Sequence, residues 1–254
     1  MIYPTGDVHT KIDNWEQKKS GNELDAAKKY LEILKKNRVA CTLFINGKCL
    51  DENPEKIKEF LDYDAELGGH TYDNFKSMHI IKSYFYRKFF NCIYGPAYYQ
   101  EKDIKRTKST FQKFGLKMTS WRTHAYGSNE KTFEILRQEG VRYVSDLFED
   151  NIIEKDGIIH MAINIPVDNV TMSYGPFAPS NREPFVGCAK SRIKPEEWFE
   201  ILKKRIESNE KKGKPSILLI HPITMASFDN FELFEKIAKF LSKYKTNKIS
   251  EFRF

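Results

Sequence analysis

The sequence lacks a long apolar segment. Nowhere in its 254 residues does an apolar run reach eighteen residues, which is about the shortest length that crosses a bilayer as a helix. A charged, then apolar, then small-residue leader is also missing, because the first expected strand begins at Ile2. We therefore expect no transmembrane segment and a cytoplasmic location.

Cysteine is scarce, and its spacing is that of neither a zinc site nor a disulfide framework. The four cysteines are far apart and form no C-x-x-C pair: Cys41, Cys49, Cys92 and Cys188. Structural zinc sites and small disulfide-stabilised domains both need closely spaced cysteines. We expect reduced thiols that belong to the core or have no special role.

Acidic residues are outnumbered, which gives a formal net charge of +7. Lysine pairs such as Lys28-Lys29 and Lys203-Lys204 alternate with glutamate on expected helices. A solvated helix surface is the simplest interpretation. The alternative is attraction to phosphate, as in a nucleotide sugar, a lipid diphosphate or an anionic membrane surface. We expect no nucleic-acid partner, and the sequence does not indicate an oligomeric state.

Internal repeats and linker-like stretches are also absent, so we expect one domain over residues 1–254. Apolar periodicity predicts strands and helices in alternation along the chain. The expected strands are 2–7, 39–45, 65–69, 116–122, 141–146, short pieces within 158–167, 216–221 and a terminal 248–254. The expected helices are 22–36, 53–61, 103–115, 129–139, one beginning at Pro195, and 231–244. Such alternation is typical of parallel strands joined by helical crossovers, in a barrel or an open sheet.

Residues 75–100 are the least regular part of the sequence and are rich in tyrosine and phenylalanine. The favoured interpretation is a helix whose aromatic face packs on the main body. Alternatively, part of the segment overhangs the site as a sugar-stacking wall or lid, or forms a contact between two copies.

Polar side chains gather where the expected strands end, which is where parallel α/β folds place their chemistry. They are Asp7, His9, His70, Asp73, Asn74, Arg122, His124, Ser145, Asp146 and His221. Four of the six histidines of the chain are in this set. Imidazoles and oxygen ligands bind Zn²⁺ or a similar divalent ion, which acidifies water and polarises a carbonyl group. A carboxylate and a further histidine supply base and acid. The set therefore predicts metal-assisted hydrolysis.

Six stretches occur in an order that resembles the NodB-type polysaccharide deacetylases, carbohydrate esterase family 4. They are TGDVHT, ACTLFINGK, ELGGHTYDN, SWRTHAYG, VRYVSD and ILLIH, which extend from residue 3 to about residue 222. The resemblance implies an α/β fold, a distorted (β/α) barrel with about seven parallel strands. It also implies a divalent metal cofactor, with zinc as the first candidate.

The first motif of that family is usually T-F-D-D-G. The resemblance implies that Asp7 is the general base, whereas Val8 stands where the family has an aspartate ligand. Some relatives that act on lipid-linked sugars carry D-V-D or D-V-E instead. His9 stands at that later acidic position, and we expect it to be a metal ligand.

The second motif is usually H-[ST]-x-x-H, with two histidine ligands one helical turn apart. Here the resemblance implies that His70 and Asn74 are metal ligands, the latter through a weak amide oxygen. Asp73 or His124 would compensate for the weak ligand if either points inward.

The later motifs supply the remaining roles that the resemblance implies. Arg122 pairs with Asp7, and backbone N–H groups near Ala125 or Tyr126 stabilise an oxyanion. Asp168 corresponds to a poorly defined fourth motif, and His221 is the general acid.

The sequence thus predicts a hydrolase that removes an N- or O-acyl group from a sugar, with acetyl as the first candidate. A nucleotide- or lipid-linked precursor of a surface glycan is the expected substrate and partner. One alternative is a hydrolase of a cyclic amide or imide on the same fold. The other is a catalytically silent relative that binds a glycan or a protein.

Overall fold

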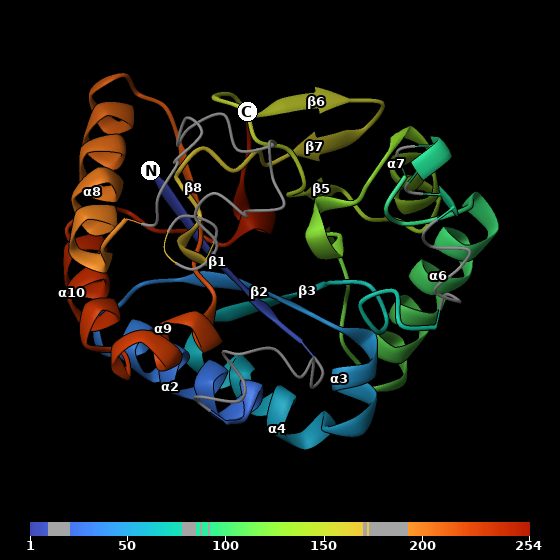
Figure 1. The fold of residues 1–254 in the computed structure, drawn as a ribbon, viewed down its shortest axis with the longest axis horizontal. Helices are drawn as coiled ribbons and strands as arrows, with labels where there is room; N and C mark the ends of the chain where they lie inside the picture. The colour runs from blue at the N-terminus through green and yellow to red at the C-terminus, as the bar shows by residue number, and fades with distance from the viewer. Residues whose placement is uncertain (10–20, 78–84, 87, 91, 170–171, 173–192) are drawn as a thin grey trace.

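The computed structural model describes residues 1–9, 21–77, 85–86, 88–90, 92–169, 172 and 193–254. Its centre is one eight-stranded sheet in the order β6-β7-β5-β4-β3-β2-β1-β8. The sheet curls on itself, and the helices lie around its outside (Figure 1). Among the described residues, no helix is both long and apolar enough to cross a membrane.

The strands are β1 Ile2–Val8, β2 Cys41–Ile45, β3 Ala65–Gly69, β4 Ser120–Trp121, β5 Tyr143–Val144, β6 Ile153–Lys155, β7 Ile158–His160 and β8 Ser216–Leu219. The α-helices are α2 Glu23–Lys36, α3 Gly47–Glu52, α4 Pro54–Lys58, α6 Ala97–Lys113, α7 Glu130–Gln138, α8 Pro195–Lys211, α9 Pro222–Asp229 and α10 Glu232–Leu241. Seven strands pair in parallel, and β6 alone is antiparallel, beside β7. The predicted barrel with about seven parallel strands is therefore confirmed.

Alternation of side chains along β1 separates two cores. Ile2 and Val8 belong to the larger cluster, which lies between the sheet and the helices. Tyr3 belongs to a smaller cluster inside the curl, together with Phe44 of β2 and other inward side chains. Because strand side chains alternate with period two, Asp7 points to the same side as Tyr3. The Asp7 side chain, near the end of β1, therefore points into the barrel.

Helix ends follow the signals in the sequence. The Asn22 side chain accepts a hydrogen bond from Leu24 N at the start of α2. Asn129 and Thr132 form a capping box at the start of α7, and Gly140 follows that helix with a φ of 79°. These contacts satisfy backbone groups that a helix leaves unpaired. The predicted boundaries of both helices are confirmed to within one residue.

The C-terminus differs from the prediction. Residues 249–251 form a 3-10 turn and not a strand. Ile249 N donates to Thr42 Oγ1, and Ser250 N donates to Glu66, so side chains of β2 and β3 take the place of a neighbouring strand. Ile249 is fully buried in the inner cluster. The predicted terminal strand is wrong because Ile249 is buried inside this end of the barrel, and the segment does not pair with the edge of the sheet.

Two further expectations have a partial outcome. Phe85, Phe89 and Phe90 are exposed, so the expected packing of an aromatic helix face on the body is wrong for these three. Much of the rest of that segment lies outside the described residues. Cys41, Cys49 and Cys92 are free and buried, as predicted, whereas Cys188 lies outside the described residues.

Candidate active site

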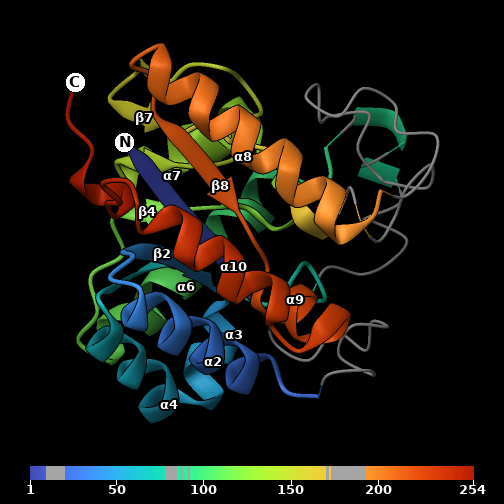
Figure 2. The same cartoon turned by 90° about the vertical axis from the view of Figure 1, so that its left-hand side faces the viewer.

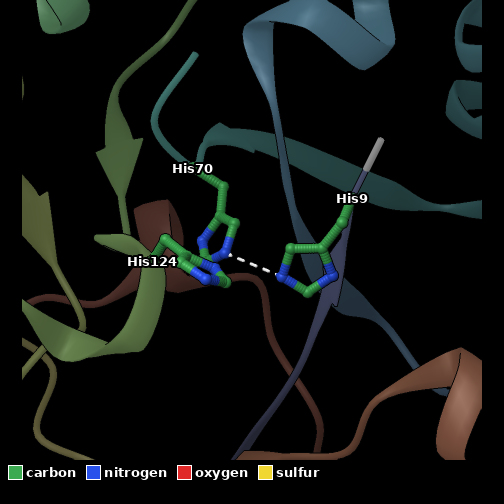
Figure 3. A group of neighbouring side chains, drawn as sticks. All are labelled: His9, His70 and His124. Atoms are coloured by element: carbon green, nitrogen blue, oxygen red, sulfur yellow. Dashed lines mark hydrogen bonds between the residues drawn. The ribbon is translucent and has the colours of Figure 1, made fainter. Parts of the chain in front are cut away.

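Three histidines from three different strand ends form one cluster. His9 follows β1, His70 follows β3, and His124 lies just beyond β4. Nε2 of His9 and Nε2 of His70 are 3.1 Å apart, and one nitrogen from each of the three rings lies within 4.8 Å of the others. Figure 3 shows the three rings facing one another.

The cluster fits a divalent ion. Two imidazole nitrogens on one tetrahedral zinc are about 3.3 Å apart, given zinc–nitrogen distances of about 2.0–2.1 Å. The His9–His70 pair is close to that spacing already. Three imidazoles are also a donor set that suits zinc and neighbouring transition metals. A small rearrangement of His124 would complete the set.

The local environment keeps two of these rings neutral. Burial lowers the pKa of His70 to about 3, against the attraction of Asp7 and with added repulsion from His9. Burial also lowers the pKa of His124 well below its usual value, and the rings of His9 and His70 add to the effect. A neutral imidazole has the lone pair that a metal needs. His70 and His124 are therefore in the form that binds a metal.

Asp7 is a buried carboxylate between one cation and two histidines. Its Oδ1 accepts a hydrogen bond from Arg122 Nη1 at 2.9 Å. Its Oδ2 lies 3.9 Å from Nε2 of His70 and 3.8 Å from Nε2 of His221. Burial alone would raise the pKa of Asp7, but Arg122 and the histidines outweigh burial and hold the pKa well below its usual range. Asp7 is thus ionised beside the histidine cluster.

Arg122 is fully buried, and its ion pair holds the Asp7 carboxylate in place. Besides Asp7, its guanidinium donates to Thr5 Oγ1 at 2.9 Å and to the carbonyl and hydroxyl oxygens of Ser145 at 2.9 and 2.6 Å. The group also lies 4.4 Å from the centre of the Phe44 ring. A planar guanidinium held at several points is a rigid partner for a carboxylate. The predicted Arg122–Asp7 pair is present.

His221 is held by a second buried carboxylate. Its Nδ1 is 2.7 Å from Oδ1 of Asp168, and its backbone N donates to Oδ2 of the same residue at 2.8 Å. Asp168 has no exposed surface. A carboxylate on Nδ1 fixes the ring orientation and leaves Nε2 directed at Asp7. Two carboxylates therefore face opposite sides of one imidazole.

The loop that carries His70 is formed by bends and turns and is not helical. Thr71, Asn74 and Phe75 have positive φ values of 59°, 58° and 65°, an unusual conformation for side chains other than glycine. The Asn46 side chain donates to the His70 carbonyl oxygen and to Asn74 Oδ1. Strained backbone of this kind persists only where surrounding contacts enforce it.

Gly69 is the last residue of β3 and directly precedes His70. A Cβ atom at Gly69 would lie 2.5 Å from side-chain atoms of both Trp121 and Met118, so these two side chains occupy the space that any larger residue would need. Beyond the glycine, Tyr72 N donates to both carboxylate oxygens of Asp103. Burial raises the pKa of Asp103 to about 7, against the hydrogen bonds of Tyr94 and Tyr72.

The loop that carries His124 is fixed by Asp146. Thr123 N donates to Oδ1 of Asp146 at 2.7 Å, and the Ser128 hydroxyl donates to Oδ2. Burial raises the pKa of Asp146 to about 6, although these hydrogen bonds lower it. Ala125 also has a positive φ of 52°. The Asp146 carboxyl thus anchors both ends of a strained loop.

The expected oxyanion donor Tyr126 is already occupied. Tyr126 N donates to the Thr123 carbonyl oxygen at 2.9 Å, and its ring packs edge-on against Phe148. Its backbone N–H therefore serves the 3-10 turn. Ala125 is the alternative that remains from the sequence.

Asp73 and Asn74 lie in the His70 loop, and one side-chain oxygen of each accepts hydrogen bonds from neighbouring residues. Oδ1 of Asp73 accepts hydrogen bonds from the backbone N and the hydroxyl of Ser77 at 3.3 and 3.2 Å. Oδ1 of Asn74 accepts from Asn46 Nδ2 at 3.0 Å. The ligand role of Asn74 stays a prediction, with its oxygen engaged elsewhere. The position of His124 matches the compensation expected if that ring points inward.

Two supporting residues were not anticipated from the sequence. Asn46 holds the His70 loop from the end of β2. Glu23, at the start of α2, is buried, and its Oε1 is 3.6 Å from Nδ1 of His9. Asn46 directly follows the apolar strand β2, and the rule that functional residues gather at strand ends could have identified it. Glu23 looks like an ordinary first-turn acid of an amphipathic helix, so the sequence carries no signal for its burial.

Comparison with known proteins identifies one matching sequence family. The sequence model of the polysaccharide deacetylase family matches residues 20–144. No curated protein sequence matches the chain.

Three solved structures share the fold. A protein of Mycobacterium smegmatis described as a polysaccharide deacetylase has a TM-score of 0.69 and 14% identity, covering 98% of this chain and 86% of that one. The PuuE allantoinase has a TM-score of 0.63 and 13% identity, covering 97% and 86%. A carbohydrate esterase family 4 pseudoenzyme of Bacillus anthracis has a TM-score of 0.54 and 17% identity, covering 99% and 64%. Identities this low establish the fold alone.

Proposed function

We propose that this chain is a divergent member of the polysaccharide deacetylase family, whose sequence model matches residues 20–144, and that it hydrolyses an acyl group, with acetyl as the first candidate, from a sugar. Its family is one of carbohydrate deacetylases, which cleave carbon–nitrogen bonds. The proposal assigns the chemistry to one catalytic domain over residues 1–254. It takes a divalent metal as cofactor, with zinc as the first candidate.

The position of Asp7 is the observation that carries the proposal. One carboxylate oxygen pairs with Arg122, while the other lies within 4 Å of both His70 and His221. A general base that lies between the histidines of a candidate metal site and a general acid is the arrangement that amide hydrolysis needs. A protein that only binds glycans has no use for three such groups in one place.

We assign His9, His70 and His124 as the residues that would hold the metal. A divalent ion there would acidify water and polarise the acyl carbonyl group. Ionised Asp7 would accept the proton of the attacking water, and Arg122 would keep the carboxylate oxygen aimed at it. Asn74 remains the competing third ligand from the sequence.

We assign His221 as the general acid. Its Nδ1 is bound to Asp168, so the proton on Nε2 is the one that can be transferred to a departing amine or alcohol. The two carboxylates beside the ring would stabilise the imidazolium before the transfer. Asp168 acts through His221, and we class it as a positioning residue.

For the substrate we propose a nucleotide- or lipid-linked sugar precursor, met in the cytoplasm. The net charge of +7 supports a substrate that carries phosphate. The sugar and the acyl group are left open.

A catalytically silent glycan binder is the second candidate. The engagement of Asn74 by Asn46 and the position of Val8 in the outer core favour it, since both family ligand positions are lost. A substituted form of the Bacillus anthracis pseudoenzyme is described as having restored activity. Hydrolysis of a cyclic amide, the reaction class of an allantoinase, is a third possibility on the same fold.

Metal analysis combined with acetate release tests the proposal. Purified protein should retain about one divalent ion per chain and release acetate from an N-acetylated nucleotide sugar, and chelation should abolish the release. His221→Ala should lose release while retaining the ion, whereas His160→Ala, outside the cluster, should change neither. An absence of any divalent ion at millimolar excess would contradict the proposal. Ring-opened product from a hydantoin, without acetate release, would favour the cyclic amide instead.

A further inference from the structure

The segment between Asp73 and Glu101 has a composition unlike the rest of the chain. Its 27 residues contain no aspartate or glutamate, four lysines or arginines, and nine phenylalanines or tyrosines. It therefore contributes +4 of the net charge of +7 in about a tenth of the length. Elsewhere the lysines alternate with acidic residues, as a solvated surface does.

The described part of this segment exposes large aromatic side chains. Phe85, Phe89, Phe90 and Tyr98 are 52%, 60%, 63% and 63% exposed. They account for four of the eight large hydrophobic side chains that are exposed among the described residues. We call these four residues the aromatic patch. An apolar group of this size at a surface is typical of an interaction site.

Within the segment, rings stack on one another and a cation lies among them. The Phe85 and Phe89 rings are 4.4 Å apart, and the Tyr86 and Phe90 rings are 5.1 Å apart. Lys88 Nζ lies 5.9 Å from the centre of the Phe89 ring. Residues 85, 86 and 88–90 are helical, and this short teal-green piece stands apart from the sheet and its helices (Figure 2).

The segment is tied to the histidine cluster at both ends. The Phe75 ring packs 5.5 Å from the His124 ring and 5.0 Å from the Tyr94 ring. The hydroxyls of Ser77 and Tyr99 are 3.1 Å apart, and Tyr94 donates to buried Asp103 at 2.8 Å. The two ends of the segment therefore meet beside the loops that carry His70 and His124.

We propose that the aromatic patch docks the protein on an anionic lipid bilayer. Phenylalanine and tyrosine insert at the level of the headgroups, while neighbouring lysine and arginine bind anionic lipid. Docking would bring the histidine cluster to a sugar attached to a lipid in that membrane. This last step rests on the proposed function, whereas the docking itself does not.

The charge of the segment distinguishes a bilayer from the other possible occupants. A second copy would bring a second segment with +4 and no acidic partner, and like charges at a contact are destabilising. A neutral glycan would stack on the rings but would not need the cations. An anionic bilayer satisfies both features of the segment at once.

Sedimentation with vesicles of defined lipid tests the inference. The full chain should bind vesicles that contain phosphatidylglycerol and bind pure phosphatidylcholine vesicles at least about fivefold less, given roughly one fivefold factor per basic residue at the surface. Phe89→Ser/Phe90→Ser should reduce binding about tenfold or more, because two aromatic anchors are lost. Lys88→Glu should reduce binding about fivefold or more, and added salt should reduce it further.

Leu61→Ser is the matched control, because Leu61 is also exposed, at 46%, but lies in the 3-10 helix Glu59–Tyr63 that follows α4. Figure 2 shows α4 on the opposite side of the molecule from the short helical piece of the segment. The Leu61→Ser variant should bind vesicles as the wild type does. Equal binding by the Phe89→Ser/Phe90→Ser variant and the wild type would overturn the inference. So would a concentration-dependent dimer that this variant abolishes, in the absence of vesicle binding.

The inference and the proposed function can fail separately. Vesicle binding should be unchanged in metal-free protein, whereas acetate release should not survive metal removal. The Phe89→Ser/Phe90→Ser variant should keep wild-type release from a water-soluble acetylated sugar and lose release only from a vesicle-bound one. Loss of release from both substrates would overturn a docking role.

Discussion

The backbone around His9 and the backbone around His70 are positioned by different means. Asp7 and His9 lie at the end of a regular strand, where alternation of side chains directs both into the barrel. His70 is followed by a loop in which Thr71, Asn74 and Phe75 have left-handed backbone. A strand end can be recognised from local pattern, because its geometry is set by period two. A strained loop is held by distant partners, and its geometry follows from them.

Replacing Asp7 should have the largest effect and tests the strand-end region. Asp7→Asn keeps the size of the side chain but removes the negative charge between Arg122 and His221. We expect acetate release to fall at least about a thousandfold, which is within the range for loss of a general base. The measurement is kcat by acetate assay. A melting curve should accompany it, since leaving buried Arg122 unpaired also destabilises the fold.

A retained rate within tenfold of the wild type would contradict the base role of Asp7. The strand end would then be a structural ion pair. Another group would then accept the proton of the attacking water.

A pair of variants in the loop region separates the two candidate third ligands. His124→Ala should weaken zinc binding by about a hundredfold or more, because it removes one of three imidazoles. Asn74→Ala should change zinc affinity by less than about threefold, because its oxygen already accepts from Asn46. Competition with a chromophoric chelator gives both affinities. The reverse order of effects would restore Asn74 as the ligand.

Glycine substitutions compare the two strands directly. At Gly69 a Cβ would lie 2.5 Å from Trp121 and Met118. At Gly6 of β1 it would meet Leu43 at 3.0 Å. We expect Gly69→Ala to lower the free energy of unfolding by about 2–3 kcal/mol and Gly6→Ala by about 1 kcal/mol, by overpacking. Urea unfolding measures both. Equal losses of stability in the two variants would show that the packing around Gly69 is no tighter than the packing around Gly6.

Titration of Asp103 should give the smallest effect. Burial raises its pKa to about 7 in the fold, against about 3.9 in an unfolded chain. The unfolded state therefore releases this proton first, and stability present below about pH 4 should be lost as the pH rises through 7. Asp103→Asn should flatten that decline by about 1–2 kcal/mol. Urea unfolding of both proteins at pH 5 and pH 8 measures the difference. An unchanged slope would place the titration elsewhere.

Several site residues could be predicted from the sequence, and others could not. The strand-end rule was enough to find Asp7, His9, His124 and His221. The left-handed backbone of Thr71, Asn74 and Phe75 was not anticipated, because a motif spacing does not report the backbone that carries it. Glu23 and Asn46 escaped notice for the same reason, since each is defined by a partner far along the chain.

The sequence by itself determined the alternation of strands and helices, the inward direction of Asp7, and the set of polar residues at one edge of the sheet. These depend on local periodicity and on the geometry of parallel strands. Only the tertiary structure decided that His124 joins His9 and His70. It also decided that Asn74 is held by Asn46 and that Phe89 and Phe90 face outward. Those outcomes depend on which side chains become neighbours after the sheet curls, and local pattern carries no record of that.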